Sequence, residues 1–345
     1  MTKLTLKPLG LLVLPFVCIA SLKAQTVADP VGVVKVTIAA APAAGQSKLT
    51  AISATLRGAI DYQGTATSIG TFATTSQPLN TGVTTWTATQ WTAEPHLCYI
   101  ENAAGAEEAY LITANTTAGV LTLATSFDLD TRYPTTATFR ICKAQTFGSL
   151  FGTSSVPFLT ANSSANADNI HVWDGGGWVT YHHNGSSWQS PATAFGGDAN
   201  DTVIFPDEGL FVLRRATTAI TLTLNGSVPT KTQISTISGG SLSFVSNRYP
   251  VGTTLNSLGF HNLANWGTAA SEANADVAYV WNGTDDSWTS YWHNGSSWQS
   301  AATAFGGDAN GDAIVADSAI FILRRSTSTA ANSPNAHALP YTIGP

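Results

Sequence analysis

Short segments in which apolar and polar residues alternate fill most of this chain, and Gly, Asn, Asp and Thr separate them. Residues 170–173 read Ile-His-Val-Trp, and residues 178–183 read Trp-Val-Thr-Tyr-His-His. A period of two residues is typical of β-strands that bury one face, whereas no stretch shows a sustained helical period. The pattern therefore predicts an all-β fold.

The N-terminal part has apolar or alternating segments of strand length, without a repeat. Strands of this length with polar turns between them predict a small β-barrel or sandwich over residues 25–145. The segments lie at 32–39, 49–56, 86–91, 97–101, 109–113, 120–124 and 138–142.

The second half contains an internal repeat. Residues 181–200 and 291–310 are identical at 18 of 20 positions, and the Ala-Asn-Ala-Asp sequence of 165–168 returns at 273–276. A repeat of this length indicates a duplicated structural unit. We expect two tandem antiparallel β modules, at 146–228 and 254–345, with a connector at 229–253.

Each module contains an Asn-Gly pair, which is a strong hairpin signal. If Asn184 and Gly185 form a two-residue loop, Tyr181 faces Trp188, and in the second copy Tyr291 faces Trp298. The turn before it places one tryptophan opposite another in each copy. These expected pairs are Trp173 with Trp178 and Trp281 with Trp288.

Aromatic residues occupy both faces of the expected module sheets. One face belongs to the core, and the other requires a second layer, a partner or a ligand. Exposed aromatic rings would hold sugar rings by stacking, whereas buried ones would stabilise the sheet as cross-strand pairs. We expect Trp292 to be the most exposed, because its counterpart is His182. The candidate ligand-binding residues are Trp178, Tyr181, Trp188, Trp288, Tyr291, Trp292 and Trp298.

Charged residues are scarce: 15 Lys and Arg and 21 Asp and Glu give 10% and a net charge of −6. An ordinary soluble domain has about 25% charged residues. Without a basic cluster, the chain is not expected to bind nucleic acid or an anionic membrane.

The first 24 residues have the composition of a secretory signal peptide. Lys3 and Lys7 precede an apolar stretch at 8–22, and the small residue Ala24 marks a cleavage position. No later apolar run is long enough to span a bilayer. We therefore expect a mature protein without a membrane span that is secreted, extracellular or at the cell surface.

Two cysteines remain after the signal segment, Cys98 and Cys142, both in apolar strand-like runs. In an oxidising compartment they have one possible intramolecular disulfide. We expect that disulfide, with two buried free thiols as the alternative.

Two polar motifs are candidate binding sites. Asp308, Asn310 and Asp312 have the spacing of a calcium loop, but Ala occupies positions where such a loop needs Gly and a carboxylate. We expect a polar turn there, with Ca²⁺ as the alternative, and no other cofactor. Each module also ends in two arginines, Arg214-Arg215 and Arg324-Arg325, for which we expect structural pairing with Asp198 or Asp308 rather than anion binding.

Several short motifs resemble an uncharacterised family of exported β-rich hypothetical proteins from Verrucomicrobia and related bacteria. They are Asp29-Pro-Val-Gly32, Ile112-Thr-Ala-Asn115 followed by Leu121-Thr-Leu123, and the aromatic Asn-Gly hairpin that precedes the Arg-Arg strand. The resemblance implies export and a β-rich fold, and it assigns no catalytic residue. Members of that family usually carry one such module, so the duplication departs from their pattern.

The sequence predicts a non-enzymatic structural protein of the surface or extracellular matrix. Its strand edges carry few of the charged residues that normally prevent pairing with another chain. Residues 31–39 or 338–343 would therefore add to the sheet of a neighbouring molecule, or alternatively pair within their own chain. The expected partners are further copies, other envelope or matrix components, or polysaccharide. A glycan-binding protein is the alternative and a secreted hydrolase the third possibility, although no Ser–His–Asp order or carboxylate pair stands out.

Overall fold

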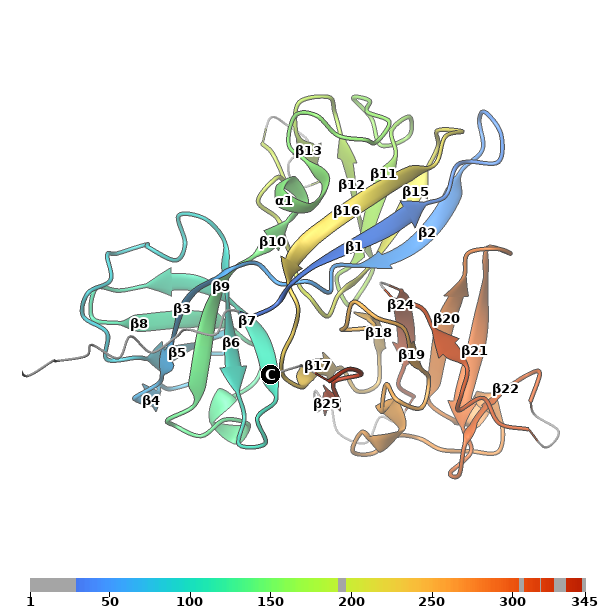
Figure 1. Ribbon diagram of the computed structural model, residues 1–345. Helices are drawn as coiled ribbons and strands as arrows, with labels where there is room; N and C mark the ends of the chain where they lie inside the picture. Colours follow the sequence, from blue (N-terminus) through green and yellow to red (C-terminus); the bar gives the residue numbers. More distant parts are fainter. Residues whose placement is uncertain (1–28, 192–196, 304–306, 317, 326–332, 343–345) are drawn as a thin grey trace, which may run out of the picture.

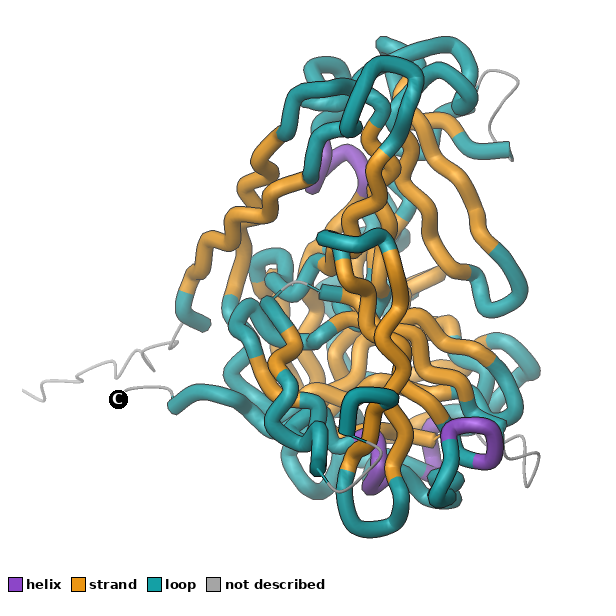
Figure 2. Tube along the Cα trace, turned by 90° about the vertical axis from the view of Figure 1, so that its right-hand side faces the viewer, coloured by secondary structure: helices purple, strands orange, loops and turns teal. Residues whose placement is uncertain are grey.

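The computed structural model describes residues 29–191, 197–303, 307–316, 318–325 and 333–342, so the predicted signal peptide lies outside the described residues. Strands make up nearly all of the regular structure, and helices are limited to single turns (Figure 2). These turns are α1 (Phe147–Phe151), η1 (Leu129–Thr131), η2 (Phe260–Asn262) and η3 (Glu272–Asn274). The all-β prediction is confirmed. None of the described helices has the length and apolarity needed to cross a membrane.

One curled antiparallel sheet forms the part at the left of Figure 1. Its strand order is β3-β9-β6-β7-β8-β5-β4, which is open, so the expected barrel is not closed. The two end strands follow each other in the chain, which curls the sheet around one core. The strands are β3 (Ile60–Thr65), β4 (Ser68–Ile69), β5 (Ser76–Asn80), β6 (His96–Glu101), β7 (Glu107–Asn115), β8 (Val120–Ala124) and β9 (Thr138–Lys143).

The first module has a five-stranded sheet in the order β13-β12-β11-β15-β2, with a two-stranded ribbon of β1 and β16 against it (Figure 1). The second module repeats this order as β22-β21-β20-β24-β18, with β17 and β25 pairing in place of the ribbon. The first contains β1 (Val31–Ile38), β2 (Lys48–Ser53), β10 (Gln145–Thr146), β11 (Asn169–Trp173), β12 (Trp178–His183), β13 (Trp188–Gln189), β14 (Val203–Ile204), β15 (Gly209–Arg214) and β16 (Ile220–Ser227). The second contains β17 (Gln233–Ile237), β18 (Leu242–Ser246), β19 (Thr253–Thr254), β20 (Val277–Asn282), β21 (Ser287–His293), β22 (Trp298–Ser300), β23 (Ala313–Ile314), β24 (Ala319–Leu323) and β25 (Ser333–His337).

The strand pairings correct the expected domain boundaries. β1 and β2, expected in the N-terminal domain, pair with β16 and β15 and so complete the first module. β17 and β18, expected in a connector, are core strands of the second module. The curled sheet is therefore an insertion between β2 and β10. In the second module the corresponding strands, β18 and β19, are joined by a short loop.

β1 also answers the question of where the N-terminal strand pairs. All eight of its residues pair with β16 of the same chain, from Val31 with Ser227 to Ile38 with Ile220. Residues 338–342 form no strand. Of the two possibilities for the N-terminal strand, addition to a neighbouring molecule or pairing within its own chain, the structure shows the second.

The hairpin registers were predicted correctly at one turn and wrongly at the other. Trp173 faces Trp178, as expected, and the second copy repeats this pair. Across the Asn-Gly turn, however, Trp188 faces His183 rather than Tyr181. The reason is the Asn184 side chain, whose Oδ1 accepts hydrogen bonds from the backbone N–H groups of residues 186 (2.8 Å) and 187 (2.9 Å) and so closes a four-residue turn. In the second copy, Trp298 likewise faces His293 instead of Tyr291.

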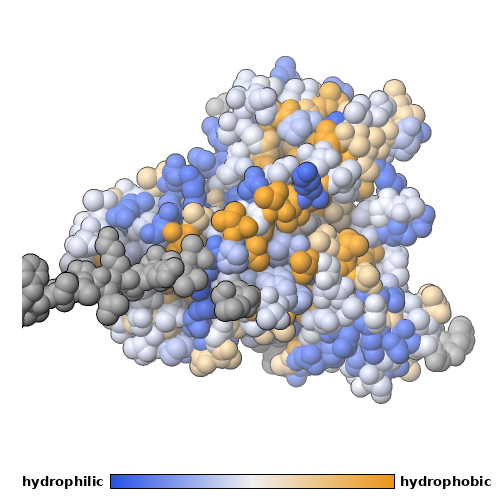
Figure 3. Space-filling view, viewed as in Figure 1, coloured by the Kyte–Doolittle hydropathy of each residue, from blue (hydrophilic) through white to orange (hydrophobic). Residues whose placement is uncertain are grey.

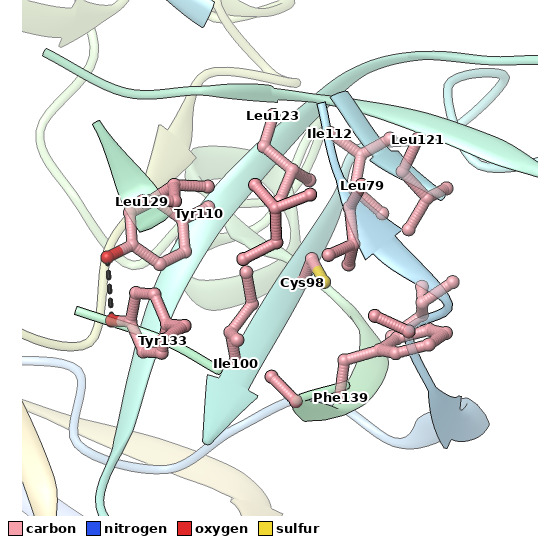
Figure 4. Close-up of a cluster of buried hydrophobic side chains, with 14 of the residues drawn as sticks. Leu79, Cys98, Ile100, Tyr110, Ile112, Leu121, Leu123, Leu129, Tyr133 and Phe139 are labelled. Carbon is pink, nitrogen blue, oxygen red and sulfur yellow. Dashed lines mark hydrogen bonds between the residues drawn. The ribbon is translucent and has the colours of Figure 1, made fainter. Parts of the chain in front are cut away.

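The expected disulfide is wrong, because Cys98 and Cys142 are buried free thiols. They lie on neighbouring strands, but Cys98 is opposite Ile141 and Cys142 is opposite Leu97. Adjacent residues on a strand point to opposite faces, so the two sulfur atoms lie on different sides of the sheet. Figure 4 shows Cys98 in the core of the curled sheet, whereas Cys142 belongs to a separate cluster on the other face.

Buried charges concentrate where the insertion meets the two modules. Glu107, at the start of β7, forms ion pairs with Arg57 (2.7 Å), with Arg140 (3.4 Å) and, at 3.8 Å, with Lys231. Arg140 also pairs with Asp29 (3.0 Å). The partners come from the β2–β3 connection, from β9 and from the segment before β17. One buried carboxylate therefore joins all three parts of the molecule.

Candidate functional site

The outer faces of the two module sheets meet in a cluster of aromatic rings. Trp178 of β12 contacts Phe321 of the second module at 5.5 Å between ring centroids, and Trp288 of β21 contacts Phe211 of the first at 5.6 Å. Phe211 and Phe321 occupy equivalent positions three residues before each Arg-Arg pair. The two modules thus exchange equivalent contacts, as subunits do across a two-fold interface.

A cleft of about 400 Å³ opens at the edge of this cluster. Trp178 and Trp288 are 41% and 37% exposed, so solvent reaches both side chains. Pockets for small organic ligands begin at about 300 Å³ and are mainly apolar and aromatic. The cleft is lined by Leu49, His171, Trp178, Thr180, Phe211, Leu213, Trp281, Trp288 and Phe321.

The two modules differ at the residue that faces the phenylalanine before each Arg-Arg pair. In the second module, Phe244 of β18 faces Phe321, and its ring packs on Phe321 (4.4 Å) and Phe211 (5.0 Å). The first module has Ala51 of β2 at the equivalent position, facing Phe211. A methyl group stands where the other copy has a benzyl group. Ala51 does not itself line the cleft, but it faces Phe211 and lies two residues from Leu49, both of which do.

Polar groups at the cleft are few and uncharged. The imidazole Nδ1 of His171 lies 3.0 Å from the Thr180 hydroxyl. Burial, and secondarily the charge of Arg215, lower the pKa of His171, so the ring is neutral at pH 7. The buried indole N–H of Trp281 has no hydrogen-bond partner among the described residues. The cleft thus offers flat apolar faces with a small number of hydrogen-bonding groups.

Of the seven predicted ligand-binding residues, only Trp178 and Trp288 line this cleft. Trp188 and Trp298 are fully buried in the cores of the first and second module, on the other face of each sheet. The indole N–H of Trp188 donates there to the Gly152 carbonyl (2.8 Å). Tyr181 and Tyr291 pack against the same two cores. Strand alternation separates the two groups, as the sequence indicated for Trp178 and Tyr181.

The expectation that Trp292 is exposed is wrong, because it retains only 6% of its exposure. Trp292 lies on the same face of β21 as Trp288 and Ser290. The turn η3 contacts this strand, and the Ser290 hydroxyl donates to the Glu272 carboxylate (2.8 Å). The sheet face is therefore covered at this end of β21 and open at the Trp288 end.

The candidate calcium loop is a polar turn in this structure. The Asp308 carboxylate accepts from the Asn310 backbone (3.1 Å), and the Asn310 side-chain oxygen accepts from the Trp298 backbone N–H (2.9 Å). Burial is the main reason why the pKa of Tyr291 is raised to about 12. The interaction of its hydroxyl group with Asp312 raises that pKa as well. The residues described include no group of three or more His, Cys, Asp or Glu side chains suited to a metal ion.

The arginine pairs are structural, but their partners are not Asp198 and Asp308. Arg214 forms a buried ion pair with Asp168, and Arg324 pairs with Asp276 at 3.3 Å. Asp168 and Asp276 close the repeated Ala-Asn-Ala-Asp motif, so the same pairing occurs in both modules.

The cleft residues that the sequence did not single out include His171, Phe211, Phe321 and Leu49. Phe211 and Phe321 recur at the same distance before the Arg-Arg pairs, and that recurrence was available as a signal. Leu49 gave no such signal, because its place beside Leu213 emerges only from strand pairing.

The chain has no match among protein-family models, curated proteins or solved structures.

Proposed function

We propose that this protein is an exported, non-enzymatic carbohydrate-binding protein that holds an uncharged glycan in the cleft between its modules. The observation that carries the proposal is the pair of half-exposed tryptophans, Trp178 and Trp288, at a 400 Å³ cleft lined by further aromatic rings. The apolar C–H faces of a sugar stack on flat aromatic rings, and buried rings on either side hold such rings in place.

The lining also favours an uncharged ligand. None of the residues that line the cleft is Asp, Glu, Lys or Arg, and burial keeps His171 neutral at pH 7. A charged sugar would lose its hydration there without gaining an ionic partner. Hydroxyl groups of a neutral sugar would instead meet the His171–Thr180 pair.

The test is binding of the mature protein to a panel of neutral and acidic polysaccharides, followed by calorimetry with soluble oligosaccharides. Thr180→Phe enlarges a side chain that lines the cleft, so we expect at least a tenfold loss of affinity without a loss of fold. Trp178→Ala should have a similar effect. Leu159→Ala removes an exposed apolar side chain outside the cleft and serves as the control. Binding that is unchanged in both cleft variants would refute the site, and no binding to any polysaccharide would refute the function.

A structural role is a second candidate, and β1 favours it. β1 pairs with β16 on one edge, and no described strand pairs with its other edge. Val31 and Val33 on β1 are 80% and 61% exposed, and apolar surface gathers near the centre of the face in Figure 3. An open apolar edge is a site for strand addition by another copy.

Light scattering of the mature chain at micromolar concentration tests this role. We expect concentration-dependent association that Val33→Lys abolishes, because a charged residue on an edge strand disfavours pairing. A monodisperse monomer at every concentration would remove the support for a structural role.

A further inference from the structure

Two histidine rings lie face to face behind the hairpin of the second module. The imidazoles of His261, in η2, and His293, at the end of β21, have centroids 4.9 Å apart and planes inclined by 14°. The Trp298 ring meets both edge-on, at 5.9 and 5.6 Å. The stack therefore joins η2 to the hairpin formed by β21 and β22.

Both rings use the Nδ1 atom as a hydrogen-bond acceptor. The indole N–H of Trp298 donates to Nδ1 of His261 (3.3 Å), and the backbone N–H of Gly295 donates to Nδ1 of His293 (3.2 Å). A histidine nitrogen can accept only when it carries no proton. Protonation of either ring therefore removes an acceptor, and protonation of both places two cations against each other.

We propose that the His261–His293 stack is a pH-sensitive contact, which anchors the β21–β22 hairpin to η2 at neutral pH and releases it in mildly acidic solution. This inference does not depend on the carbohydrate proposal. Its basis is the stacked geometry together with the two Nδ1 acceptors.

The electrostatic surroundings support this behaviour. Burial lowers the pKa of His261, and burial followed by the charge of His261 lowers that of His293. A histidine whose pKa is lowered by folding stabilises the fold above the unfolded value of about 6.5, and this contribution is lost as pH falls. Acidification therefore weakens the contact.

Charged and titratable groups on the adjoining elements act on other partners. Glu272 accepts from Ser290, on the other face of β21, and Asp312 interacts with Tyr291. Asp276 binds Arg324 and the Gly267 backbone. His337 packs against the Phe260 ring, and burial, followed by Arg248, lowers its pKa to about 3. No described carboxylate compensates a positive charge on the stack.

The first module provides an internal comparison. Thr153 occupies the position equivalent to His261, so no described imidazole stacks on His183, the counterpart of His293. His182 precedes it on the strand and points to the other face. The Nε2 of His183 donates to the Thr153 carbonyl (2.8 Å), while its Nδ1 accepts from Gly185 (3.1 Å). His183 therefore lacks the stacked imidazole partner that His293 has.

Hydrogen exchange of the full chain at pH 7.5 and 5.5, corrected for intrinsic exchange rates, tests the proposal. We expect protection of the second hairpin, residues 287–300, to fall at least tenfold more on acidification than protection of the first, residues 178–190. His261→Thr, which introduces the residue of the first module, should remove this difference. Equal responses of the two hairpins, or an undiminished response in His261→Thr, would overturn the proposal.

Two further measurements keep the test decisive if His261→Thr does not fold. Thr153→His should give the first hairpin the acid response of the second. In the unmodified protein, nuclear magnetic resonance titration should show both stacked imidazoles with pKa values below the ordinary histidine range. An ordinary pKa for both rings would contradict the inference.

Discussion

At the scale of single residues, tryptophan has two roles in each module, and strand parity decides between them. Trp188 and Trp298 are fully buried in the cores, and each has a hydrogen bond for its indole N–H. Trp178 and Trp288 lie on the outer faces and remain half-exposed. The first pair stabilises the modules, whereas the second pair is available to a ligand.

These roles predict different costs of truncation. Trp298→Ala should lower the free energy of unfolding by about 3–5 kcal/mol, because it leaves a large cavity in a packed core. Trp288→Ala should cost clearly less, since solvent already reaches its ring. Urea unfolding measures both values, and equal losses would show that the two rings are equivalent.

Glu208 predicts a pH dependence of stability. Burial raises its pKa to about 8, while the backbone N–H of Phe205 donates to its carboxylate (3.0 Å). Because the folded state holds this proton more tightly than the unfolded state, the contribution of Glu208 is present below pH 4.5 and is lost as pH rises towards 8. Glu208→Gln keeps an acceptor and removes the charge. We expect it to raise the melting temperature at pH 8 more than at pH 5, and an equal change at both pH values would contradict this.

At the scale of elements, the module hairpins depend on turns closed by a side chain. The Asn184 carboxamide caps the turn, and Gly185 adopts a φ of 104°. Gly295 adopts 103° at the same place in the second copy. Residues with a Cβ rarely adopt such angles, so a glycine follows the asparagine in both copies.

The glycine requirement is testable with a matched pair of substitutions. Gly185→Ala should lower the free energy of unfolding by about 1–2 kcal/mol, the cost of a left-handed backbone for a residue with a Cβ. Gly177→Ala lies in the neighbouring turn, without a positive φ and with open space around its added methyl group. It should be close to neutral in thermal unfolding. A cost for Gly177→Ala equal to that of Gly185→Ala would show that the left-handed backbone of Gly185 is not the cause.

The sequence predicted local features well, because they depend on neighbours along the chain. Alternation placed Trp178 and Tyr181 on opposite faces, and turn closure paired Trp173 with Trp178. The register across Asn184 was missed because a side-chain cap lengthens that turn by two residues. The burial of Trp292 was missed because coverage of a strand face is set by other segments.

At the scale of the whole molecule, the insertion was not predictable, since its only sign is the pairing of strands far apart in sequence. β2 meets β15 and β1 meets β16 across the entire inserted sheet. The candidate cleft has the same origin, because Leu49 of β2 meets the lining residues of β15 only through this pairing. Periodicity identifies a strand but not its neighbour.

The junction around Glu107 predicts how strongly the three parts depend on one another. Glu107→Gln leaves the buried guanidinium of Arg57 without its anionic partner, which should cost about 3–5 kcal/mol of unfolding free energy. The exposed pair of Glu94 and Lys143 (2.6 Å) is the control. Glu94→Gln should leave the unfolding midpoint unchanged, because solvent screens exposed ion pairs. A small effect of Glu107→Gln would show that the junction tolerates loss of its central charge.

The insertion of the curled sheet between β2 and β10 also sets an order of assembly. The curled sheet and the second module are each built mainly from one continuous stretch of chain, 60–143 and 233–337, so most of their contacts form after short loops close. The first module cannot be completed until residue 227 is available to pair with β1. High contact order slows folding, and domains of a growing chain fold as units. During synthesis we therefore expect the inserted sheet to fold before the module that contains it. In refolding from denaturant we expect the closure of β1 on β16 to be the slow phase.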